Sequence, residues 1–146
     1  MLDIPIEETL KGYEKSTNEE KIFLTRYYSI IDGSFTQVGR VIINEKSGYT
    51  IHIPSSWDDN VTIFDSSLQN EWILKYYNGS IGIDNTNEIM AIKTRSISEY
   101  QDVFEAAIYH TCLTRGATEY QIRLPDLVPL GYDMDFETAA ELITLN

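Results

Sequence analysis

The chain has 146 residues, a formal net charge of −12 and one cysteine. No apolar run approaches the roughly 20 residues needed to span a bilayer, and the acidic start of the sequence lacks the basic residues of a secretory signal. A single cysteine cannot form an internal disulfide. We therefore expect one domain over residues 1–146, in an intracellular (cytoplasmic) protein or in a particle assembled inside the cell.

The negative charge is concentrated at the two ends of the sequence. Residues 1–20 carry six acids and two lysines, and residues 126–146 carry five acids without Lys or Arg, so these ends hold −9 of the net −12. Nucleic acid and anionic membranes should repel such a protein, and we expect it to bind neither directly. The acidic ends either serve solubility or form docking arms that meet a basic protein surface.

The first third of the chain predicts a terminal segment followed by a β-meander. Residues 1–20 indicate a short helix or a capping arm, in which Pro5 limits the length of any helix. Asp32-Gly33 is a strong hairpin signal, and Gly39 inside the following strand indicates a bulge or a close backbone approach. Branched and aromatic residues predict strands over 22–31, 35–44 and 49–53.

The middle of the chain continues the strand pattern. Asn78-Gly79 is the preferred pair for a two-residue type I′ turn, and we expect a hairpin there with a return strand over Ser80–Asp84. The other predicted strands span 61–64, 72–77 and 88–93.

The segment Ser98–Gly116 is predicted to be one long amphipathic helix, over about 98–115. Ser98 is a favourable N-cap, Gln101 occupies the capping-box position, and Gly116 can close the helix. Apolar residues recur at the spacing of one buried stripe, at Tyr100, Val103, Phe104, Ala107, Ile108 and Cys112.

A strand over 119–124 and a short C-terminal helix capped by Asp135 complete the expected elements. The order of many strands, a helix, a strand and a last helix predicts an α+β fold. In this fold a mainly antiparallel β-meander sheet packs against the long amphipathic helix.

The sequence offers few residues for chemistry. His52, His110 and Cys112 are too few for a structural zinc site, and on a helix His110 and Cys112 would point to different sides. The doublet Asp58-Asp59 and the acidic run Asp133–Glu137 single out no pair of carboxylates for hydrolysis or calcium binding. We predict no catalytic residue, no cofactor and no bound metal.

Apolar residues beside the acidic ends are the best candidates for an interface. The segment Leu127–Tyr132 combines apolar side chains with an irregular backbone, and it either covers the protein's own core or docks on a neighbour. The interface candidates are Leu127, Val128, Leu130, Tyr132, Ile4, Ile6 and Leu10.

These patterns favour a non-enzymatic subunit that works through protein–protein contact in a larger assembly, such as a viral or phage connector or neck protein. Its partners would be protein chains, in a homo-oligomer or a hetero-assembly. The alternative is an acidic inhibitor of a nuclease or of a defence protein that imitates nucleic acid, which needs its acids spread over one continuous face. A hydrolase that uses a carboxylate pair is a third hypothesis.

Overall fold

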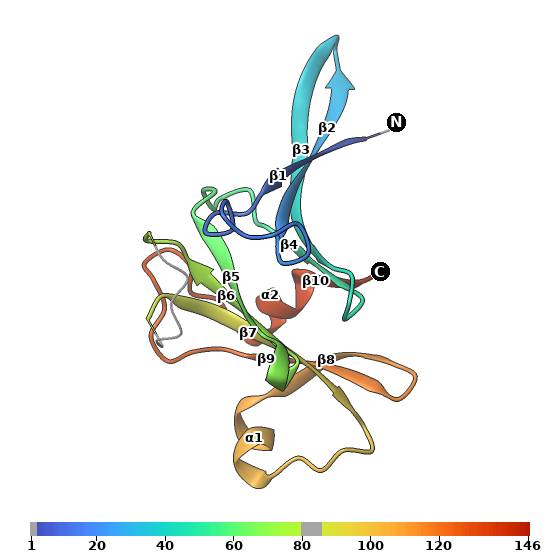
Figure 1. Ribbon diagram of the computed structural model, residues 1–146, viewed down its shortest axis with the longest axis vertical. Coiled ribbons are helices and arrows are strands. Elements are labelled where there is room, and N and C mark those ends of the chain that lie inside the picture. The colour runs from blue at the N-terminus through green and yellow to red at the C-terminus, as the bar shows by residue number, and fades with distance from the viewer. Residues whose placement is uncertain (1–2, 80–85) are drawn as a thin grey trace. The chain divides into compact units, whose positions relative to one another are not determined.

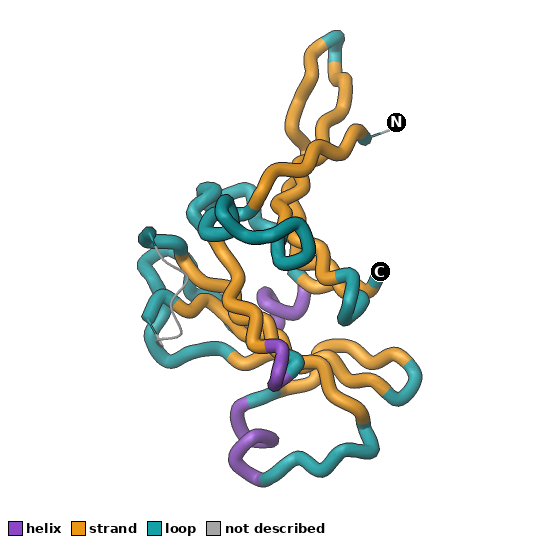
Figure 2. Tube along the Cα trace, viewed as in Figure 1, coloured by secondary structure: helices purple, strands orange, loops and turns teal. Residues whose placement is uncertain are grey.

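The computed structural model describes residues 3–79 and 86–146. The chain divides into two compact units, Met1–Asp59 with Leu142–Asn146 (unit 1) and Asn60–Glu141 (unit 2). Each unit is built on a five-stranded antiparallel sheet, and strands make up most of the regular structure (Figure 1, Figure 2). The organisation as a single domain stays a prediction.

Unit 1 contains the sheet with strand order β1-β2-β3-β4-β10. Its strands are β1 (Ile4–Thr9), β2 (Phe23–Ile31), β3 (Ser34–Asn44), β4 (Tyr49–His52) and β10 (Ile143–Leu145). Ile42, Ile51 and Ile143 lie directly opposite one another on adjacent strands, so they share one face of the sheet. All three are buried and form the centre of the core of this unit.

The β2–β3 hairpin confirms two predictions. Asp32 and Gly33 have φ angles of 51° and 79°, as a type I′ turn requires. Between the pairs Tyr28↔Gln37 and Tyr27↔Gly39 the register shifts by one residue. The strand β3 therefore has a bulge beside Gly39, and beyond it Arg40 lies opposite Arg26 (register Arg26↔Arg40).

Residues 3–20 contain no helix, so the short helix considered for residues 1–20 is wrong. Ile4–Thr9 instead pairs with Phe23–Tyr28 as the edge strand β1. In a strand, side chains alternate between the two faces, so Ile4, Ile6 and Glu8 share one face of β1. Proline has no backbone N–H to donate, and an edge strand tolerates Pro5 for this reason.

Unit 2 contains the sheet with strand order β5-β6-β7-β9-β8. Its strands are β5 (Val61–Ser66), β6 (Glu71–Tyr76), β7 (Glu88–Ser96), β8 (His110–Arg115) and β9 (Thr118–Arg123). Ile63, Leu74, Met90, Ile92 and Ile122 are fully buried in its core. The return strand predicted over Ser80–Asp84 lies outside the described residues.

The long helix predicted over 98–115 is wrong. The helix α1 covers only Val103–Ile108, and the chain continues as β8. Asp102, and not Ser98, is the N-cap, since its carboxylate accepts from the backbone N–H of Glu105 at 2.8 Å. Gly116, with a φ of 59°, takes part in the tight connection from β8 to β9 instead of closing a helix.

The fold class is therefore mostly β, and the α+β expectation with one long helix is corrected. Both described α-helices have six residues. The second, α2 (Phe136–Glu141), is the predicted C-terminal helix, and Asp135 accepts from the backbone N–H of Thr138 at 2.8 Å as expected of its cap. No helix in the described part of the chain is long and apolar enough to cross a membrane.

Candidate protein-binding surfaces

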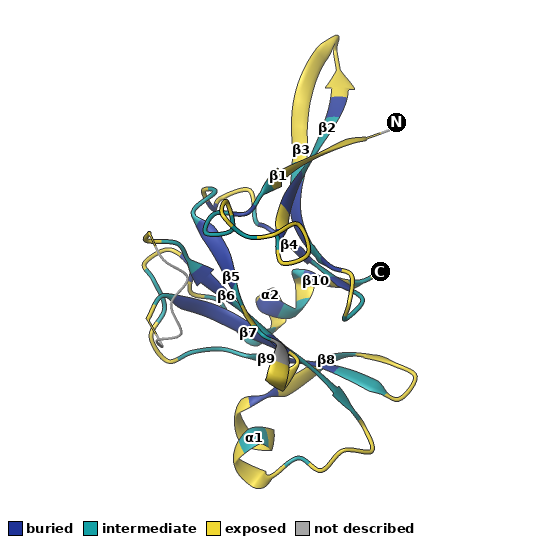
Figure 3. Cartoon of the chain, in the orientation of Figure 1, coloured by how far each residue is buried: buried dark blue, intermediate teal, exposed yellow. Residues whose placement is uncertain are grey.

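The outer end of the β2–β3 hairpin is mostly exposed (Figure 3), and several of its exposed residues are apolar. Ile30 and Phe35 lie directly opposite each other, and they are 60% and 55% exposed. Tyr28 stacks on Phe35 with ring centroids 4.6 Å apart, and Ile4 of β1 lies opposite Tyr28. Ile6 follows two residues along β1 and is 45% exposed.

These side chains lie on one face of the sheet, since residues that are opposite each other or two apart along a strand share a face. We name this set the arm surface, made of Ile4, Ile6, Tyr28, Ile30 and Phe35. Contiguous exposed apolar surface of this kind marks an interaction site more often than scattered apolar residues do. Ile4 and Ile6 are thus brought together with hairpin residues that were not predicted as interface candidates.

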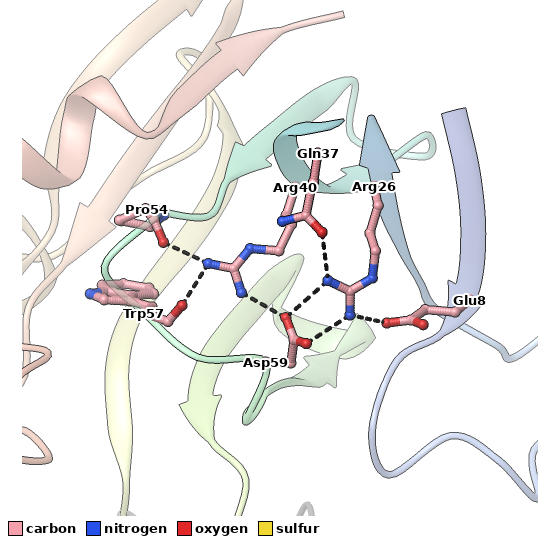
Figure 4. Close-up of polar contacts among 7 residues, drawn as sticks. All are labelled: Glu8, Arg26, Gln37, Arg40, Pro54, Trp57 and Asp59. Atoms are coloured by element: carbon pink, nitrogen blue, oxygen red, sulfur yellow. Dashed lines mark hydrogen bonds and ion pairs between the residues drawn. The ribbon is translucent and has the colours of Figure 1, made fainter. Parts of the chain in front are cut away.

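An ionic network lies at the inner end of the same hairpin (Figure 4). Asp59, from the loop after β4, accepts from Arg26 at 2.8 Å and from Arg40 at 2.7 Å. Arg26 also bonds Glu8 of β1 at 2.5 Å and Gln37 of β3 at 3.2 Å. The network therefore joins β1, β2, β3 and the loop after β4 at the inner end of the hairpin.

Arg40 anchors the loop as well as the strand. Its side chain is only 6% exposed, and its second terminal nitrogen donates to the carbonyl oxygens of Pro54 and Trp57 at 2.7 and 2.6 Å. Because the bulge places Arg40 opposite Arg26, two positive charges face each other across the strands. Like charges in this position destabilise a sheet, and the carboxylate of Asp59 offsets their repulsion.

Hydrogen bonding to Arg26, with a further contribution from Arg40, holds the pKa of Asp59 below its usual value. A carboxyl with a depressed folded pKa stabilises the fold above its unfolded pKa of about 3.9, and that stabilisation is lost as the pH falls through the folded pKa. We expect the stability difference between the wild type and Asp59→Asn to narrow on acidification from neutral pH. Urea unfolding of both proteins, from neutral pH down to below about pH 3.9, measures the difference in their free energies of unfolding. A difference that does not change with pH would contradict the role of the charge.

The other predicted interface residues fall into two groups. Leu10 and Tyr132 are buried, at 1% and 8% exposure, and Tyr132 packs against Tyr76 with ring centroids 5.5 Å apart. Leu127 and Leu130 are 87% and 100% exposed, and Val128 is half-buried. Within Leu127–Tyr132, the two exposed leucines are the residues available to a partner.

The reactive side chains considered in the sequence have separate surroundings. His110 and Cys112 both lie on β8 and not on a helix, so the argument from helical geometry no longer applies. The His110 ring meets Phe136 edge-on at 5.9 Å, whereas the Cys112 thiol donates to the Tyr120 carbonyl at 3.3 Å. Burial raises the pKa of this thiol, which favours its protonated form.

His52 bonds the hydroxyl of Thr144 at 2.9 Å. Over residues 3–79 and 86–146, no three His, Cys, Asp or Glu side chains are grouped so that they could hold a metal ion. Comparisons with protein-family models, with curated proteins and with solved structures find no match for this chain.

Proposed function

We propose that the protein is a non-enzymatic subunit of a larger protein assembly and that the arm surface is one of its contacts. The observation that carries this proposal is the row of apolar side chains on β1, β2 and β3, exposed to solvent in a chain that is otherwise strongly acidic. A connector or neck subunit of a viral or phage particle is one assembly of this kind.

A second copy of the chain is the partner that the charges favour for the arm surface. Two copies with a net charge of −12 repel each other over most approaches. On the face of the sheet that carries the arm surface, the acid Glu8 is paired with Arg26, so the charge between the strands is balanced there. The ionic network at the inner end of the hairpin holds the strands that present it.

The experiment is to replace Phe35 by Glu and to measure the solution mass by light scattering over a range of concentrations. The wild type is expected to self-associate. Burying a large apolar side chain contributes about 1.5–3 kcal/mol, so the variant should associate at least about tenfold more weakly. Leu68→Glu is the matched control, because Leu68 is 98% exposed and lies in unit 2.

Three results would count against this proposal. They are a wild-type chain that stays monomeric at every concentration, a Phe35→Glu variant that associates as well as the wild type, and an equal loss in Leu68→Glu. Self-association that disappears with rising salt would also contradict it, since contact between apolar side chains should persist.

A further inference from the structure

The segment around α1 is attached to the sheet of unit 2 by polar side chains. Glu105 pairs with Lys93 at 2.6 Å, and Gln101 accepts from and donates to Gln121. The hydroxyl of Tyr109 donates to the buried carboxylate of Glu71. Gln101, Glu105 and Tyr109 are four residues apart, so the side of the segment that faces the sheet is its polar side.

Most of α1 is exposed (Figure 3), and its exposed residues include the large apolar ones. At 3.6 residues per turn, Val103 lies about 160° and Phe104 about 100° around α1 from Glu105. Ile108 lies only about 60° from Glu105, but it is also exposed. Val103 and Phe104 are 79% and 83% exposed, and no residue of α1 is buried. We name the exposed apolar residues of this segment the helix surface: Ile97, Tyr100, Val103, Phe104 and Ile108.

The helix surface continues into a groove in unit 2. Ile108 and Leu127 both line this groove, which has a volume of about 520 Å³. Leu124 and Pro125 add further apolar lining, and the ion pair of Arg123 with Glu88 at 3.1 Å lies there too. The exposed Leu127, predicted as an interface residue, therefore adjoins α1 at a concave site.

The charged side chains of the segment that carries the helix surface are all negative. The sequence from Ser96 to Tyr109 contains no Lys or Arg. Glu99 and Asp102 are exposed beside the apolar residues, and Asp126 is exposed at the groove. A second copy would bring the same acids against these, so charge complementarity favours a basic partner over self-association.

From this geometry we infer that the helix surface binds a basic amphipathic helix of a partner protein. The apolar stripe of that helix would cover Phe104 and its neighbours and place a side chain in the groove beside Leu127. Its flanking Lys or Arg residues would meet Glu99, Asp102 and Asp126. Helices that pack through such stripes are a recurring mode of protein recognition. The helix surface is separate from the arm surface, so this inference does not depend on the self-association proposed for the arm surface.

The test uses the full chain and a fluorescent synthetic helical peptide of Leu and Lys, with Leu along one face. We expect the wild type to bind it and Phe104→Ser to bind at least about tenfold more weakly, since a large apolar contact is lost. Phe35→Ser, the matched change on the arm surface, should bind as the wild type does. Anisotropy gives the affinities, and amide NMR shifts should map the peptide to residues 97–108 and to the groove residues 123–127.

Thermal melting by circular dichroism checks that each variant is folded, and a peptide with Ser in place of Leu tests charge alone. Equal binding of the Ser peptide would overturn the inference, because attraction between opposite charges would then suffice. An equal loss of peptide affinity in Phe104→Ser and Phe35→Ser would also overturn the inference. So would amide shifts confined to residues outside the helix surface and the groove. Binding of phosphatidylcholine vesicles that requires Phe104 would assign the surface to lipid and overturn it as well.

Discussion

Replacing Asp59 by Asn should lower the free energy of unfolding of unit 1 by roughly 2–3 kcal/mol. The change removes the carboxylate between two arginines that face each other across β2 and β3. Loss of one partner from a buried ion pair costs about 3–5 kcal/mol. The cost here is smaller because Asp59 is 40% exposed and Arg40 keeps two carbonyl acceptors.

The two tryptophans allow the units to be followed separately. Trp57 lies in unit 1 and Trp72 in unit 2. In a Trp72→Phe background, urea unfolding followed by Trp57 fluorescence therefore measures unit 1. Glu8→Gln is the control, because Glu8 bonds the same Arg26 but is 51% exposed, so we expect a loss below about 1 kcal/mol. Equal effects of the two changes would show that Asp59 has no special role between the arginines.

Tyr109→Phe should destabilise unit 2 by about 1–3 kcal/mol, the cost of leaving a buried polar group without its partner. The carboxylate of Glu71 is buried, with the residue only 4% exposed, and it accepts from the Tyr109 hydroxyl. Burial and the bond to Glu71 raise the pKa of Tyr109 to about 12, so the hydroxyl stays a donor at neutral pH.

Fluorescence of Trp72 in a Trp57→Phe background measures this change. Tyr100→Phe is the matched control, since Tyr100 is 88% exposed in the same segment, and it should leave the stability unchanged. Tyr109→Phe with the stability of the wild type would mean that Glu71 satisfies its hydrogen bonds in another way.

Local sequence signals predicted the strands β2 to β7 and β9, but they missed β1, β8 and β10 and indicated a long helix that is not there. The hairpin at Asp32-Gly33 and the bulge beside Gly39 depend on backbone preferences within a few residues. The apolar stripe of residues 100–112 has the period of a buried helix, but a period does not say which side of a segment is covered. Here the polar side meets the sheet, and β8 is strand because it pairs with β9 in a hairpin.

The ionic network depends on contacts that no local pattern contains. Arg26, Arg40 and Asp59 are far apart in the sequence and belong to no charged run. In a hairpin with a two-residue turn at Asp32-Gly33 and no bulge, Arg26 would lie opposite Gly39. The extra residue of the bulge brings Arg40 there instead, and the loop after β4 supplies Asp59. The sequence signals for a turn and a bulge were present, but they had to be combined to find the pair of arginines.

The division of the chain has a consequence for the order of folding during synthesis. Unit 2 is one continuous stretch, whereas the sheet of unit 1 takes β10 from residues made after it. Because all of unit 2 lies between β4 and β10 in the sequence, β4 lacks a neighbour on one edge throughout the synthesis of unit 2. The nascent chain must keep that edge unpaired until the last strand arrives, and Ile51 is covered on that side only when Ile143 has been added.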